Sequence, residues 1–137
     1  MGLVLDSSVI VFTERQELSV SMLLNKLQKQ HGATDIVMSA VSVAELEHGI
    51  HRAQSSQQAS KRRHYLDTVF AAIPAEPFTR DMGQIVGQVD AEARKQGRVI
   101  PFSDLLIGAT ALHFGFGLVT HNDRHFRMIP NLNVLPF

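Results

Sequence analysis

Three carboxylates occur at places in the sequence where such a side chain needs an explanation. Asp6 interrupts an apolar run near the start of the chain, and Asp104 opens the most apolar helical stretch. Glu45 lies between two apolar neighbours, Ala44 and Leu46. Because a buried charge must be paired or must bind a metal ion, we consider these three acids as candidate catalytic residues and metal ligands.

Each of these acids also has a structural explanation. Asp6 could cap the helix that follows it, although the two serines beside it can do the same. Glu45 follows Ser42 by three residues, which is the spacing of a capping box. Asp104 would interact favourably with the positive end of its helix, an effect worth at most about 1 kcal/mol. The structural and functional explanations are about equally good for Glu45, whereas the functional one is favoured for Asp6.

Taken together, the acids predict a metal site. Carboxylates packed into one cleft repel one another, and each resists ionisation beside the others. A divalent cation removes this conflict, and oxygen ligands without His or Cys favour Mg²⁺ or Mn²⁺ over Zn²⁺. The reaction that follows most naturally is hydrolysis of a phosphodiester, in which the metal activates water and stabilises the leaving oxygen.

The hydrophobic pattern predicts short buried strands that alternate with helices, which is typical of one α/β domain with a mostly parallel sheet. Strands are expected at residues 3–5, 36–38, 118–120 and 133–135, and helices at 18–30, 43–53, 59–72, 82–93 and 104–114. Residues 54–58 are expected to be a loop and residues 74–77 an extended connection. In such sheets ligands bind beyond the carboxyl ends of the strands, where Asp6, Asn122 and Asp123 would lie.

Composition limits the class of protein. The 137 residues, 45% hydrophobic and 19% charged, fit a single globular domain over residues 1–137. The absence of cysteine excludes disulfides and thiolate metal sites and fits a reducing compartment. The apolar segment at residues 2–5 is too short for a signal peptide, and residues 105–112 are too few to cross a membrane. We therefore expect a cytoplasmic protein without a membrane partner.

The charge balance argues against binding of nucleic acid by charge alone. Thirteen basic and thirteen acidic residues give a net charge of zero, whereas such proteins are usually basic. The densest basic run is Lys61, Arg62 and Arg63. A solvated helix face is the usual explanation of such a run, and a patch that contacts phosphate is the alternative. Arg98 and Arg124 are further candidates for contact with RNA.

Four segments, in this order and spacing, resemble the PIN-domain nucleases, and specifically the VapC-type toxins of bacterial and archaeal toxin–antitoxin pairs. The resemblance covers essentially the whole chain. It is carried by LVLDSS at residues 3–8, SAVSVAEL at 39–46, GRVIPFSDLLIGATA at 97–111 and LVTHNDRHF at 118–126.

The resemblance implies a three-layer α/β/α sandwich and a Mg²⁺- or Mn²⁺-dependent endoribonuclease. Asp6, Glu45 and Asp104 match the acidic ligands of the family. Ser8, Thr120 and Asn122 match its supporting polar positions. The implied substrate is structured RNA, such as tRNA or ribosomal RNA. The implied partners are a VapB-type antitoxin, whose C-terminal segment covers the cleft, and a second copy of the chain in a homodimer.

The chain departs from the family at the fourth acid. Relatives often have an acid where Asn122 or His125 stands here, and the nearest acid in this sequence is Asp123. Either Asp123 completes the site, or three carboxylates act with Asn122 as a neutral ligand. Glu92 could also approach, although a solvated helix position explains it better. The departure keeps a second hypothesis open, in which the chain is a catalytically weak module that binds RNA or a protein without cleavage.

Overall fold

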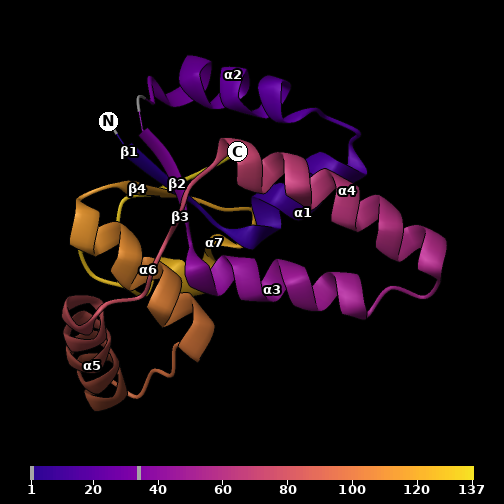
Figure 1. The fold of residues 1–137 in the computed structure, drawn as a ribbon. Coiled ribbons are helices and arrows are strands. Elements are labelled where there is room, and N and C mark those ends of the chain that lie inside the picture. Colours follow the sequence, from indigo (N-terminus) through magenta and orange to yellow (C-terminus); the bar gives the residue numbers. More distant parts are fainter. Residues whose placement is uncertain (1, 34) are drawn as a thin grey trace.

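The computed structural model describes residues 2–33 and 35–137, in which strands and helices alternate along the chain (Figure 1). Met1 and Thr34, which the expected domain includes, lie outside the described residues. In chain order the elements are β1 (Gly2–Leu5), α1 (Ser7–Arg15), α2 (Val20–His31), β2 (Asp35–Ser39), α3 (Ala40–His51), α4 (Ser56–Ala72), β3 (Ala75–Glu76), α5 (Arg80–Lys95), α6 (Phe102–Phe114), β4 (Gly117–Val119), α7 (Asp123–Phe126) and β5 (Val134–Leu135).

The five strands form one sheet in the order β3-β2-β1-β4-β5, and all neighbouring strands are parallel. Strand β1 lies in the middle, with Leu5 in register with Met38 of β2 and Val119 of β4. The chain crosses from β1 to β2 on one side and later returns to β4 on the other. The end of β1 is therefore a topological switch point, where parallel sheets bind ligands.

Alternating side chains of the sheet enter two separate cores. Leu3 and Leu5 of β1 pack in a cluster that includes residues of α1 to α4, whereas Val4 packs with residues of α5, α6 and α7. This is the period of two that a strand imposes on its side chains. Helix α2 and helix α5 accordingly lie far apart on either side of the strands (Figure 1). The expected three-layer sandwich with a parallel sheet is confirmed.

Several predicted boundaries are correct because local signals set them. Helix α2 ends at Gly32, which has the left-handed conformation (φ 61°) that stops a helix, and Ser19 caps its start. The strand at residues 36–38 and those at 118–120 and 133–135 are present with small shifts at their ends.

Two other predicted boundaries are wrong. Helix α3 begins at Ala40, and the residue that caps it is Ser39 rather than Ser42. The predicted loop at 54–58 is mostly helical, because Ser55 caps a helix that begins at Ser56. Both errors occur at the start of a helix, where neighbouring serines have similar capping ability and the sequence does not show which of them caps the helix. The connection through Ala75 and Glu76 is extended as predicted, and it also pairs with β2 as an edge strand.

Among the described residues, no helix is both long and apolar enough to span a membrane.

Candidate active site

The carboxyl ends of β1 and β4 open into a cavity of about 960 Å³. Its walls come from α1, α3, the start of α6 and the segment that follows β4. The three acids predicted from the sequence, Asp6, Glu45 and Asp104, all line this cavity. Its remaining lining residues are Ser7, Ser8, Val11, Phe12, Arg15, Gln16, His121, Asn122, Asp123, Arg124 and His125.

Asp6 is buried and is held by two hydroxyl groups. Ser8 Oγ donates to Asp6 Oδ2 at 2.7 Å, and Thr120 Oγ1 donates to the same oxygen at 2.8 Å. Asp6 occupies the N-cap position of α1, but its side chain makes no capping hydrogen bond. The structural explanation of this carboxylate as a helix cap is therefore wrong, and neither hydroxyl engages Oδ1.

The same two hydroxyls also accept hydrogen bonds from the segment after β4. The backbone N–H of His121 donates to Ser8 Oγ at 3.0 Å, and the N–H of Asn122 donates to Thr120 Oγ1 at 2.9 Å. Ser8 and Thr120 thus join the end of β1 to the end of β4. The supporting roles predicted for these two residues agree with this geometry.

Glu45 lies in the middle of α3 and accepts a hydrogen bond from Ser7 Oγ at 3.0 Å. Because α3 begins at Ala40, Glu45 is too far along the helix to close a capping box with Ser42. The Ser42 hydroxyl is instead buried, without a hydrogen-bond partner among the described residues. Partial burial, together with the nearby charges of Asp6 and Asp104, raises the pKa of Glu45.

Asp104 lies in the first turn of α6, a helix with Pro101 at its N-cap position. Helix α6 packs closely at Gly108, where an added Cβ would be 2.5 Å from Ile129 Cδ1. Burial and the charge of Asp6 raise the pKa of Asp104. His125 Nδ1, at 3.2 Å from Asp104 Oδ2, opposes this increase.

These carboxylates are electrostatically coupled, but they do not form a finished coordination sphere. Within residues 2–33 and 35–137, no group of three or more His, Cys, Asp or Glu side chains is arranged to hold a metal ion. Ser7 and His125 occupy oxygens of Glu45 and Asp104. The donor set fits a hard cation in its chemistry, since it offers carboxylate oxygens and mutual repulsion that a cation would relieve.

Several polar side chains lie where a fourth acid was expected from the resemblance to the family. Asp123 lines the cavity but is exposed, and its Oδ2 accepts a hydrogen bond from Arg127 Nε at 2.7 Å. Asn122 is exposed and contributes its backbone N–H to Thr120. The side chain that contacts Asp104 comes from His125. Glu92 is exposed on α5, beside Lys95.

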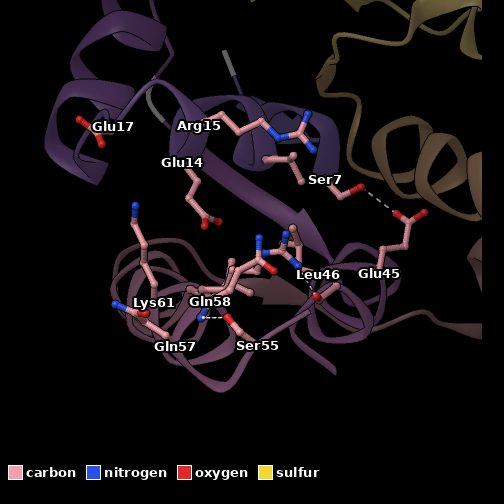
Figure 2. A pocket seen from close by; sticks show the side chains of 14 residues that line it. Ser7, Glu14, Arg15, Glu17, Glu45, Leu46, Ser55, Gln57, Gln58 and Lys61 are labelled. Atoms are coloured by element: carbon pink, nitrogen blue, oxygen red, sulfur yellow. Dashed lines mark hydrogen bonds between the residues drawn. The ribbon is translucent and has the colours of Figure 1, made fainter. Parts of the chain in front are cut away.

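A second cavity, of about 680 Å³, adjoins the first and is lined by α1, α3 and α4 (Figure 2). The two cavities share Ser7, Val11, Arg15 and Glu45. Figure 2 shows Ser7 directed at Glu45 on one wall, with Lys61 on the opposite side. The two cavities together form one continuous hollow surface along α1.

The basic residues predicted to contact RNA fall into two groups. Lys61 and Arg62 line the second cavity, and Arg124 lines the first. Arg63 instead forms an ion pair with Glu47 and lies 3.8 Å from Asp67, as the explanation by a solvated helix face predicts. Arg98 is exposed in the connection between α5 and α6.

Seven lining residues were not predicted from the sequence as site residues, namely Ser7, Val11, Phe12, Arg15, Gln16, His121 and His125. Ser7 could have been found, because it lies next to Asp6 in a run of polar residues. The family motif marks the position of His125 as one that often holds an acid. Arg15 lies in no motif, and only the course of α1 brings it to the cavity.

Comparison with known proteins gives this site a context. The model of the PIN domain family matches residues 3–132. Ribonuclease VapC19 of Mycobacterium tuberculosis is 30% identical over 128 residues, which cover 93% of this chain and 94% of that protein. Ribonuclease VapC of Rickettsia bellii is 27% identical over 135 residues, which cover 98% of this chain and 96% of that protein.

Among solved structures, that of VapBC2 from Rickettsia felis, bound to a DNA fragment from their promoter, contains a chain that superposes on this one with a TM-score of 0.83. The two chains are 25% identical, and the superposition covers 100% of this chain and 99% of the other. Family model, sequence relatives and fold therefore agree over nearly the full length. The chain belongs to the PIN domain family and is of the VapC type.

Proposed function

We propose that this protein is the toxin of a VapBC-type pair and acts as a Mg²⁺- or Mn²⁺-dependent endoribonuclease. It would hydrolyse phosphodiester bonds in structured RNA, with tRNA or ribosomal RNA as the substrate class. The observation that carries this proposal is the convergence of Asp6, Glu45 and Asp104 on one cavity. The raised pKa values of Glu45 and Asp104 support it, because burial and the neighbouring acids disfavour their ionised forms, which a bound cation would favour.

The residues that would hold the metal are Asp6 and Asp104, with Glu45 as a third ligand. When bound, the metal would lower the pKa of a water and neutralise charge on the phosphate. Asp6 needs no rearrangement, since its two hydroxyl donors already fix it. Asp104 and Glu45 would turn away from His125 and Ser7 to join it.

The side chains of the protein would orient the substrate and transfer protons. The carboxylate of Asp6 is held by Ser8 and Thr120, and the reacting phosphate would be oriented relative to it. Glu45, at the shared edge of the two cavities, either binds the metal or orients the attacking water. Its raised pKa, caused first by burial, makes Glu45 a better proton acceptor than an exposed glutamate.

The second cavity offers a path for the RNA strand beyond the scissile bond. Arg15, Lys61 and Arg62 line it and supply positive charge beside the acids. Such contacts with phosphate position the strand without reading its sequence. Arg124 would act in the same way on the other side of the acids, while Arg63 is engaged by Glu47.

The test is an RNA cleavage assay with the purified protein and defined tRNA and ribosomal RNA substrates. Cleavage should require Mg²⁺ or Mn²⁺, should stop with EDTA, and should be lost in Asp6→Asn and in Asp104→Asn. Glu92→Gln is a matched control, because Glu92 is an exposed acid paired with Lys95 on α5. Cleavage at the wild-type rate by Asp6→Asn, or without metal, would reject the proposal.

We also propose a VapB-type antitoxin as the protein partner. The solved Rickettsia felis structure is described as VapBC2, and the hollow surface along α1 could receive an extended or helical segment. An antitoxin segment with an arginine would complement the acids there. Co-expression with a small DNA-binding protein encoded next to this chain should yield a stable complex in which RNA cleavage is inhibited.

A homodimer is proposed as the assembly. The supporting observation is a set of exposed apolar side chains around α5 and the start of α6, namely Phe78, Val99 and Phe102. Light scattering should give twice the mass of one chain, and Phe102→Ser should reduce it. Met22→Ser on α2 is a matched control, because Met22 is similarly exposed on the other layer. A monomer at all concentrations would reject this assembly.

The second candidate function is a catalytically weak module that binds RNA or a partner without cleavage. Two observations favour it: the acids are not assembled into a coordination sphere, and the Asp123 carboxylate is paired with Arg127. A Mn²⁺ titration followed by calorimetry separates the two candidates. Binding at micromolar to low millimolar Mn²⁺ supports the enzyme, and its absence supports the module.

A further inference from the structure

Three aromatic rings meet at the edge of the active-site cavity. The ring centroids of Phe12 and His121 are 4.2 Å apart, with an angle of 35° between the ring planes. Phe137 contacts both of these rings edge-on, at 5.9 Å from Phe12 and 5.6 Å from His121. Phe12 and His121 line the same cavity as the acids, so aromatic surface lies directly beside the carboxylates.

The network that holds Asp6 also positions this aromatic pair. The backbone N–H of His121 donates to Ser8 Oγ, which itself donates to Asp6. Phe12 lies on α1, the helix that begins directly after Asp6. The main chain that carries each ring is therefore joined to the framework around Asp6.

Fastening of the C-terminal segment explains only part of this arrangement. Phe137 packs on the pair and lies under Lys26, whose Nζ is 4.2 Å from the ring centroid. If Phe12 and His121 served only to hold Phe137 in place, both rings could be completely buried. His121 is instead exposed, and both Phe12 and His121 form part of the cavity wall.

An unpaired base is the group that best fits an accessible ring next to these acids. Carboxylates repel the phosphates of a strand, whereas bases have uncharged faces that stack on aromatic side chains. Stacking also fits a chain of zero net charge, because it adds affinity for RNA without added basic residues.

We propose that Phe12 and His121 form a stacking site for one unpaired base of the RNA, adjacent to the phosphate that is cleaved. The site rests on the proposed ribonuclease function and deepens it. It selects substrates in which a base is free to leave its helix, such as a loop, next to the scissile bond. The two rings are binding residues and take no part in bond cleavage.

The test measures RNA binding in the Asp6→Asn background, so that the strand stays intact. The probe is a short single-stranded RNA with 2-aminopurine at successive positions, and the readouts are the dissociation constant and the fluorescence. His121→Ala and Phe12→Leu should each weaken binding about 5- to 150-fold, which corresponds to the loss of one stacked base. They should also restore 2-aminopurine fluorescence at one position of the strand.

Two control variants separate stacking from structure. His121→Phe retains a ring and should keep both affinity and quenching. His113→Ala removes a similar exposed ring, paired with Phe114 at 5.0 Å, at the end of α6 remote from Asp104 by about 13 Å along the helix axis. It should change neither readout. Phe12→Leu should lower affinity without changing its dependence on salt, because stacking releases no counterions.

The outcomes are distinguishable. If RNA binds equally well to His121→Ala, Phe12→Leu and the unsubstituted rings, and the fluorescence is unchanged, the stacking site is wrong while the ribonuclease function stands. If these variants lower the melting temperature but not the affinity, the rings only fasten the C-terminal segment, and the proposal is again wrong. If the chain neither binds nor cleaves RNA, the proposed function and the stacking site fail together.

Discussion

The two sides of the active-site cavity are built differently. On the side of the sheet, Asp6 is buried and receives hydrogen bonds from Ser8 and Thr120, which also bind the backbone after β4. On the side of the helices, Glu45 and Asp104 have raised pKa values, and each accepts one weaker contact.

The difference separates a fixed part of the site from an adjustable one. Hydrogen bonds at 2.7 and 2.8 Å hold Asp6 in one orientation, as the supporting shell of a metal ligand should. In the free protein Ser7 and His125 only partly offset the burial and mutual repulsion of Glu45 and Asp104. We infer that the sheet supplies geometry, and that α3 and α6 supply charge that a bound cation would neutralise.

The largest expected effect comes from removing one acid on each side. Asp6→Ala and Asp104→Asn should both abolish cleavage but should change the stability of the metal-free protein in opposite directions. Asp6→Ala leaves the buried hydroxyl of Thr120 and the half-buried hydroxyl of Ser8 without their acceptor and should cost about 1–3 kcal/mol. Asp104→Asn removes a repelling charge and should raise the melting temperature. Thermal denaturation in EDTA measures both changes in stability. Shifts of the same sign would contradict the proposed difference between the two sides of the cavity.

A smaller effect is expected when one of the two hydroxyl groups that hold Asp6 is removed. Thr120→Val keeps the shape of the side chain but removes one donor to Asp6 and one acceptor for the Asn122 N–H. Mn²⁺ affinity or the cleavage rate should fall about 10- to 100-fold, as for other partners of metal ligands. Thr120→Ser keeps the hydroxyl and serves as control. Equal Mn²⁺ affinity in both variants would show that the hydroxyl does not position Asp6.

The pH dependence of stability should report on the helix side. In the folded protein Glu45 and Asp104 bind protons more tightly than in the unfolded chain. Their contribution to stability is therefore complete below their unfolded pKa values of about 4 and is lost as the pH rises through the raised folded values. Mn²⁺ needs ionised ligands, so its stabilising effect should grow over the same pH range.

Melting temperatures with EDTA and with Mn²⁺, measured from acid to neutral pH, test this expectation. The metal-free curve of Asp104→Asn should fall less steeply with pH than that of the wild type. Parallel curves for the two proteins would contradict a raised pKa of Asp104.

The smallest effect is expected at Asp123. Its carboxylate is exposed and is paired with Arg127, and such pairs contribute about 0–1 kcal/mol. Asp123→Asn should therefore leave stability and Mn²⁺ affinity nearly unchanged, with Asp104→Asn as the contrasting variant. A loss of Mn²⁺ affinity comparable to that of Asp104→Asn would instead make Asp123 the fourth ligand and would extend the adjustable side of the site.

Sequence reasoning succeeded where one local signal had no competitor. Helix α2 ends, with Gly32 as its C-cap, within one residue of the predicted end at residue 30, and the apolar runs marked the strands. It failed at α3, where Ser39 and Ser42 are equally good caps and both are buried; β2 ends at Ser39, and the helix begins directly after it. It also missed the role of β3, because two residues have no periodicity, and only pairing with β2 makes them a strand.

The sequence by itself determined the order of the elements and the identity of Asp6, Glu45 and Asp104 as acids at unusual places. Hydrophobic period and local turn residues are sufficient for this. Only the tertiary structure decided that Thr120 holds Asp6, that Arg63 pairs with Glu47, and that the rings of Phe12 and His121 meet beside the acids. These contacts join residues far apart in the chain, and they depend on strand order and helix packing, which no local pattern encodes.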